Sequence, residues 1–188
     1  MNKQYIMDIL KESNSIRREF LNKYWKNLLD ISEMIIHCFK IGGKLILIGN
    51  GGSAADCQHI AAEFVNKFRT KRCALPAIAL TTDSSVITSI ANDYSFDDIF
   101  KRQIEAYGGV NDILIAISTS GKSKNIISGV KASKPFGIYS IGLTGGDGGD
   151  LVDIANETLI VKSNDVARIQ EVHILVGHII CDLVEQLI

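Results

Sequence analysis

Residues 44–53, KLILIGNGGS, join an uninterrupted apolar run to a glycine-rich turn, and a helical pattern follows the turn. Residues 113–123, ILIAISTSGKS, repeat this arrangement with hydroxyl side chains in the turn. Apolar runs without polar alternation are typical of strands that are covered on both faces of a parallel sheet. Two such units therefore predict an α/β fold with binding loops at the carboxyl ends of its strands.

Three further apolar runs bring the number of expected strands to five. The runs lie at residues 44–49, 77–82, 113–118, 138–144 and 158–161. Helical patterns separate most of them, so we expect helices on both faces of the sheet in a three-layer sandwich. A length of 188 residues, 46% of them apolar, suits a single domain over residues 1–188.

Long helical patterns occupy both ends of the sequence. From Tyr5 to about Phe39 apolar residues recur at helical spacing, either without interruption or with a break near residues 13–15. The apolar stripe of this leader, residues 1–40, needs a second surface, which is either the sheet of the same chain or a partner subunit. A further amphipathic helix is expected over residues 165–187.

Charge and composition argue against several classes of protein. The chain has 20 Lys and Arg and 21 Asp and Glu, a formal net charge of -1, without a basic stripe for a nucleic-acid backbone. It shows neither the ~20 consecutive apolar residues of a membrane span nor the apolar core of a signal peptide. Four cysteines without a C-x-x-C pair predict buried, reduced thiols. We therefore expect a cytoplasmic protein that binds neither nucleic acid nor membrane.

Both turns are suited to holding a phosphorylated small molecule, because backbone N–H groups at a helix N-terminus favour an anion. The first turn fits G-x-G-x-x-A but lacks the acid about twenty residues further on that a dinucleotide site needs. The second turn ends like a P-loop, but Ala116 stands where the leading glycine belongs. Ser53 and Asp56 resemble a capping box for the helix after the first turn. The hydroxyls of the second turn, each suited to a phosphate or to a helix cap, are those of Ser118, Thr119, Ser120 and Ser123.

Two helical segments carry the groups best suited to chemistry. His59 and Glu63 are four residues apart and share a helix face. In the C-terminal helix Gln170 and His178 lie in one row, whereas His173 projects from another side, and spacing alone does not select the functional histidine. Together, the two segments would supply nitrogen and oxygen ligands for zinc from His59, Glu63, Gln170 and His178. Without metal, Glu63 and His178 form an acid/base pair for moving a proton between adjacent sugar carbons; a solvated surface pair is the alternative.

Several motifs, in order along the chain, resemble those of the sugar isomerase (SIS) domain proteins. They are the turn at 49–53, QHIAAE (58–63), AND (91–93), STSGKS (118–123), LTG (143–145), RIQE (168–171) and then His178. The resemblance covers essentially the whole chain. It implies the SIS fold, an α/β/α sandwich around a five-stranded parallel sheet, assembled as a homotetramer through the leader at residues 1–40.

Within this family the chain resembles members that convert sedoheptulose 7-phosphate to D-glycero-D-manno-heptose 7-phosphate. This aldose–ketose isomerisation begins bacterial heptose synthesis for lipopolysaccharide or capsule. The resemblance implies that Glu63 and His178 transfer protons through an enediol, with one zinc ion per subunit bound by His59, Glu63, Gln170 and His178. The substrate contacts that it implies are Asn50, Gly51, Gly52, Ser53, Asn92, Asp93, Ser118, Thr119, Ser120, Ser123 and Gln170.

Two positions depart from the pattern of some members, which carry Asp in place of Ala167 and Arg in place of Lys67. A non-catalytic relative with the same fold binds the bacterial replication initiator as a tetrameric scaffold, and a sugar-phosphate sensor is a further alternative. That relative lacks the acid that corresponds to Glu63 and the imidazole that corresponds to His178. The presence of both residues here favours an enzyme.

Overall fold

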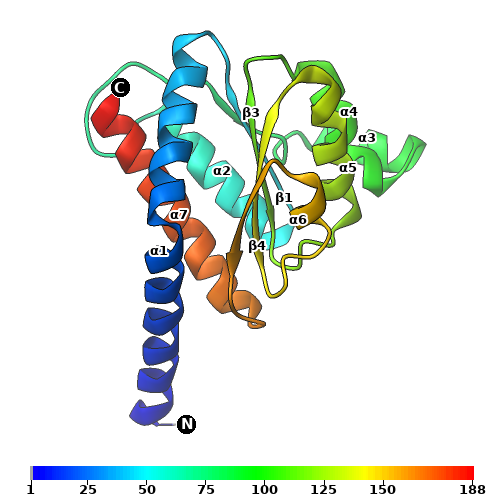
Figure 1. The fold of residues 1–188 in the computed structure, drawn as a ribbon. Coiled ribbons are helices and arrows are strands. Elements are labelled where there is room, and N and C mark those ends of the chain that lie inside the picture. The colour runs from blue at the N-terminus through cyan, green and yellow to red at the C-terminus, as the bar shows by residue number, and fades with distance from the viewer. Residues whose placement is uncertain (1) are drawn as a thin grey trace.

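A five-stranded parallel sheet lies at the centre of the computed structural model, which describes residues 2–188 (Figure 1). Its strands are β1 (Leu45–Gly49), β2 (Ala77–Ala79), β3 (Ile113–Ser118), β4 (Tyr139–Gly145) and β5 (Glu157–Val161), in the order β2-β1-β3-β4-β5. Leu45 is in register with Ala77 on one side and with Ile113 on the other. Every residue of β1 and β3 is buried, as the uninterrupted apolar runs predicted.

The predicted strands are confirmed, with shifts at their ends. β3 has the predicted bounds, whereas β2 ends at Ala79 and not at residue 82. β2 is an edge strand that pairs only with β1, and the chain turns after Leu80 toward the helix that Asp83 caps. The apolar Leu80 therefore reflects burial beyond the end of the strand, and the two threonines that follow it belong to the turn.

Helices cover both faces of the sheet, and residues alternate between two cores (Figure 1). Leu47 and Ile115 face the layer of α1 (Lys3–Lys40), α2 (Gly51–Val65) and α7 (Val166–Leu187). Ile46 and Leu114 face the opposite layer. That layer consists of α3 (Ser84–Asp93), η1 (Phe96–Asp98), α4 (Ile99–Tyr107), α5 (Lys124–Ser133), η2 (Lys134–Phe136) and α6 (Leu151–Ile154). The three-layer α/β/α fold is thus confirmed.

Helix α1 is continuous, so the optional break near residues 13–15 is wrong. Ser13 is buried and its Oγ donates a hydrogen bond to Glu171 Oε2 of α7 at 2.6 Å. Ser13, which suggested a break, therefore makes a packing contact between α1 and α7. Helix α1 packs on α7 and β5 along most of its length, whereas its first turns project beyond the rest of the chain, with Ile6 67% exposed (Figure 1).

The four cysteines are free thiols, and three of them are buried. Burial raises the pKa of Cys38 to about 11 and that of Cys181 to about 12, so these thiols stay protonated. Cys73 is exposed, which contradicts the expectation that all four are buried. It lies in the connection between α2 and β2, which has no regular secondary structure to cover it. Among residues 2–188, no helix combines the length and apolar character that a membrane crossing requires.

Candidate active site

The two predicted turns lie next to each other at the carboxyl edge of the sheet, because β1 and β3 are neighbours. The helices that follow, α2 and α5, pack on opposite faces, which is the arrangement that binds ligands in α/β sheets. Asn50 and Asn125 join the turns, since each Nδ2 donates to the other's Oδ1 at 2.8 Å. Asn125 is buried, and no sequence motif had pointed to it.

The second turn is closed by its own polar groups. Gly121 N donates to Ser118 O at 3.0 Å, and Gly121 has a φ of +63°. Ser118 Oγ donates to Ser123 Oγ at 3.2 Å, and Lys122 N donates to Ser120 Oγ at the same distance. Ser123 is the N-cap of α5 by position, but its side chain makes no capping bond. The expectation that this hydroxyl caps the helix is therefore wrong, because the hydroxyl is turned toward Ser118.

A cavity of about 360 Å³ lies between this turn and the start of α7. Thr119 and Ser120 bring hydroxyls to it, and Lys122 brings a positive charge. Lys122 Nζ is 3.5 Å from Asp147 Oδ2, but both side chains are exposed, and an exposed ion pair of this kind is weak enough for an anion to compete. Hydroxyls, a lysine and a nearby helix N-terminus together are suited to a phosphate group.

The first turn begins α2 earlier than the sequence suggested. The helix starts at Gly51, whose φ is +53°, with Asn50 as its N-cap. Ser53 is buried inside the first helical turn, so the proposed capping box of Ser53 and Asp56 is wrong. Asp56 Oδ2 is buried without a hydrogen-bond partner among residues 2–188, and this burial raises the pKa of Asp56, against the opposing effect of His59.

Helices α2 and α7 pack together and bring the predicted chemical groups into contact. His59 Nε2 lies 2.9 Å from His178 Nε2, with the ring planes at 71°. His59 Nε2 also lies 3.5 Å from Glu63 Oε1, and the His59 side chain is 50% exposed. A carboxylate and an imidazole from two helices therefore flank one accessible histidine, as the hypothesis of an acid/base pair requires.

Gln170 lies at the other end of the contact between α2 and α7. A Cβ at Gly52 would be 2.4 Å from Gln170 Nε2, so the glycine makes room for this amide. His59 is about two helical turns further along α2, roughly 11 Å away along the axis. The four predicted metal ligands thus do not form one closed cluster, and among residues 2–188 no three His, Cys, Asp or Glu side chains are placed to hold a metal ion.

The donor atoms around His59 are nevertheless of the types that bind zinc, and two of their spacings can be compared with a zinc site. Two atoms bound to one tetrahedral zinc at 2.0–2.1 Å lie about 3.3 Å apart. The distances from His59 Nε2 to His178 Nε2 and to Glu63 Oε1 are 2.9 and 3.5 Å. Each of the two spacings is close to that of two donors on one zinc ion, whereas Gln170, the predicted fourth ligand, lies beside Gly52 and away from these groups.

The predicted sugar contacts Asn92 and Asp93 are not brought to His59 within this chain. They lie at the C-terminal end of α3, in the layer on the other side of the sheet. Asn92 Nδ2 donates to Asp93 Oδ1 at 2.8 Å, and both residues are exposed. Their role in substrate binding stays a prediction.

His173, which spacing could not distinguish from His178, lies outside the site. It is buried, with Nε2 3.3 Å from Thr144 O and with Nδ1 lacking a partner among the described residues. Burial lowers the pKa of His173 to about 4, although the contact with Thr144 opposes this effect. The imidazole is therefore neutral at pH 7 and packs α7 against β4.

This burial predicts acid sensitivity of the fold. The pKa of His173 is about 4 in the folded protein and 6.5 ordinarily, so protonation favours the unfolded chain. The stability that the neutral imidazole contributes is present above pH 6.5 and is lost as the pH falls toward 4. The free energy of unfolding should fall by up to ~1.4 kcal/mol per pH unit and by roughly 3 kcal/mol in all. Denaturant unfolding of His173→Phe should show a correspondingly smaller loss between pH 7 and pH 4. Exposed His37→Phe is the control, and equal pH slopes for His173→Phe and wild type would contradict the prediction.

Comparison with known proteins gives a consistent result. A model of the SIS domain matches residues 8–145. Phosphoheptose isomerase of Clostridium acetobutylicum is 51% identical over 98% of this chain and 95% of that protein. The phosphoheptose isomerase structure from Neisseria gonorrhoeae has a TM-score of 0.92 at 38% identity, covering 98% of both chains. The one from Francisella tularensis has a TM-score of 0.94 at 37% identity, covering 99% of this chain and 100% of that chain.

Proposed function

Because the chain belongs to the SIS domain family, we propose that it is an aldose–ketose isomerase that converts sedoheptulose 7-phosphate to D-glycero-D-manno-heptose 7-phosphate. The observation that carries the proposal is the contact of His59 with both Glu63 and His178 on adjacent helices. The cavity beside Thr119 and Ser120 is the proposed position of the 7-phosphate. The product is proposed to supply heptose for lipopolysaccharide or capsule.

The proposed reaction moves hydrogen between two neighbouring carbons and two oxygens. The Glu63 carboxylate removes a proton from C1 of the ketose, which gives an enediol, and returns a proton to C2. His178 takes the proton from the C1 hydroxyl and supplies one to the oxygen on C2. No atom or electron is gained or lost overall, so the reaction needs no redox cofactor.

We further propose that His59, Glu63, Gln170 and His178 hold one zinc ion. Zinc bound there would supply positive charge to the carbonyl oxygen of the substrate. Gln170 is the neutral member of this set, and its amide packs closely over Gly52, where no Cβ stands in its way. A chelator should lower turnover, and added zinc should restore it.

We propose a homotetramer because α1 exposes apolar side chains. Ile6, Met7 and Leu10 are 67%, 46% and 48% exposed on the first turns of the helix, which project from the rest of the chain (Figure 1). An apolar stripe of this kind is usually covered by another surface. Light scattering should give about four times the chain mass of 20.6 kDa. Leu10→Glu should lower the mass, Val152→Glu on α6 is the control, and a monomeric wild type would contradict the proposal.

The direct test is an assay in which the aldose product is consumed by a coupling enzyme. Purified protein should interconvert the ketose and aldose heptose 7-phosphates. We propose that it does so in the cytoplasm, as the composition suggests. Absence of turnover in folded, zinc-supplemented protein would contradict the proposed function. Binding to the replication initiator without turnover would support the scaffold alternative instead.

A further inference from the structure

The connection between α2 and β2, residues 66–76, arches around the C-terminal end of α7 (Figure 1). Phe68 in this connection stacks on the ring of His178, with centroids 5.6 Å apart and planes at 29°. On another side His59 meets the same ring edge-on, with centroids 5.1 Å apart. The imidazole of His178 is therefore flanked by one aromatic ring from α2 and one from the connection that follows it.

Glu185 of α7 fixes the backbone on which Phe68 is carried. Its carboxylate accepts hydrogen bonds from Phe68 N at 2.9 Å, from Arg69 N at 2.7 Å and from Thr70 N. The Thr70 hydroxyl adds a fourth bond at 2.9 Å. Burial alone would raise the pKa of Glu185, but the backbone N–H groups outweigh it and lower the pKa to about 2. The carboxylate is thus ionised and fully engaged.

Arg72 ties the same carboxylate to the end of α2. Its Nε lies 3.1 Å from Glu185 Oε2, and the two side chains are only 11% and 3% exposed. Its Nη1 and Nη2 donate at 2.8 Å to the backbone oxygens of Phe64 and Glu63. A cation that binds free carbonyls at a helix C-terminus stabilises that end of the helix. The end of α2 that carries Glu63 is thereby joined to the C-terminal end of α7 through one buried ion pair.

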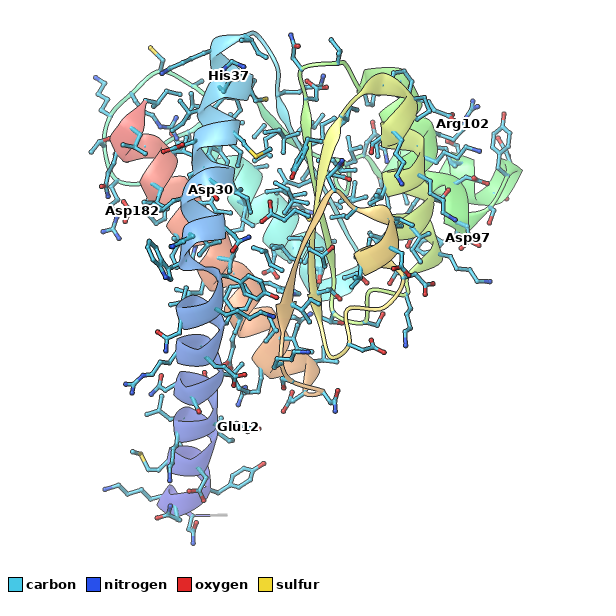
Figure 2. All side chains as sticks on the ribbon, in the orientation of Figure 1. Glu12, Asp30, His37, Asp97, Arg102 and Asp182 are labelled. Atoms are coloured by element: carbon cyan, nitrogen blue, oxygen red, sulfur yellow. The ribbon has the colours of Figure 1, made fainter. Side chains whose placement is uncertain are left out.

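A second ion pair lies on the outer side of this arrangement. Arg69 Nε is 3.0 Å from Asp182 Oδ1, and the Arg69 guanidinium lies 5.1 Å from the centre of the Phe68 ring. Asp182 is labelled in Figure 2 on α7, at the side of the molecule where the connection passes. Both ends of the stacked pair are therefore held: Phe68 through its backbone and Arg69, His178 through α7.

We propose that Phe68, held in place by Glu185 and Arg72, is a positioning residue that fixes the imidazole of His178 for proton transfer. The inference rests on the proposed function, in which His178 serves the sugar oxygens. Rotation about the bond to an imidazole ring is soft, so a ring without a stacked neighbour samples more orientations. Phe68 restricts that freedom without touching the substrate, and so should affect kcat and not KM.

The test compares four purified, folded variants in the coupled assay. Phe68→Leu should lower kcat about three- to tenfold, the range of an aromatic pair, with KM within about twofold of wild type. Phe68→Tyr keeps the ring and should retain wild-type kcat. Phe39→Leu is the matched control, because it removes another half-buried ring that packs edge-on against Phe64, 5.8 Å away, and not against His178. Glu185→Gln keeps the size of the side chain but removes its charge. It should lower kcat, as Phe68→Leu does.

A measurement that needs no turnover separates this inference from the proposed function. The ring protons of His178 in NMR spectra should shift in Phe68→Leu and Glu185→Gln, and remain unchanged in Phe68→Tyr and Phe39→Leu. Unchanged His178 signals in folded Phe68→Leu, or wild-type kcat in that variant, would overturn the positioning role. An inactive wild type would contradict the proposed function, while the His178 signals would still decide whether Phe68 positions the ring.

Discussion

Glu63→Gln is expected to lower kcat roughly 100- to 10,000-fold, the range of a positioned general base. Glutamine has the same shape but cannot accept a proton at this step. The Glu63 side chain lies 3.5 Å from His59 and is 23% exposed, so the substitution leaves no buried charge behind and the fold should persist. Because proton abstraction occurs only in the transition state, KM should change far less than kcat. The coupled assay measures both constants.

The control for this substitution is Glu105→Gln, which makes the same change on an exposed residue of α4 in the other layer. Its kinetic constants should equal those of the wild type. Zinc content is measured in parallel, because Glu63 is also a proposed metal ligand. A folded Glu63→Gln protein that turns over at the wild-type rate, with or without added zinc, would remove Glu63 from the mechanism.

Local signals in the sequence were sufficient for the sheet. Uninterrupted apolar runs followed by Gly, Ser or Thr predicted β1 and β3 almost to the residue, because strands covered on both faces need apolar side chains at every position. The predicted ends of elements were wrong where a tertiary contact, and not the local sequence pattern, determines the structure. Leu80 is apolar because it is buried after the end of β2, and Ser13 is polar inside α1 because it bonds to Glu171.

The candidate site was predictable in its parts but not in its assembly. The spacing of His59 and Glu63 placed both on one helix face, and the structure confirms their proximity at 3.5 Å. The contact of His59 with His178 joins residues that are 119 positions apart, which spacing cannot show and which the family resemblance supplied. Phe68 carries no motif at all, because its place is set by Glu185, more than a hundred residues later in the chain.

Gly121→Ala is expected to lower kcat/KM at least about 100-fold, mainly by raising KM. Gly121 has a φ of +63°, and a Cβ there would lie 1.9 Å from Gly148 O and 2.6 Å from Gly148 C. These are backbone atoms, so the turn from Ser118 to Ser123 would have to move. A hydrogen bond to a charged group contributes about 1.5–3 kcal/mol, and displacing two of the proposed phosphate donors accounts for the expected loss. Such contacts act in the ground state and the transition state alike, which is why the effect should fall on KM.

Gly42→Ala separates this effect from backbone strain. Gly42 has a φ of +82° in the connection between α1 and β1, and a Cβ there would meet nothing within 4 Å. This variant bears only the conformational cost of a side chain in the left-handed region, about 1–2 kcal/mol, without a clash. The KM of Gly42→Ala should equal that of the wild type, and inorganic phosphate should inhibit Gly42→Ala and the wild type equally. If Gly121→Ala also binds substrate and phosphate normally, the phosphate does not lie on the turn from Ser118 to Ser123, and the helix N-terminus at Gly51 becomes the remaining anion site.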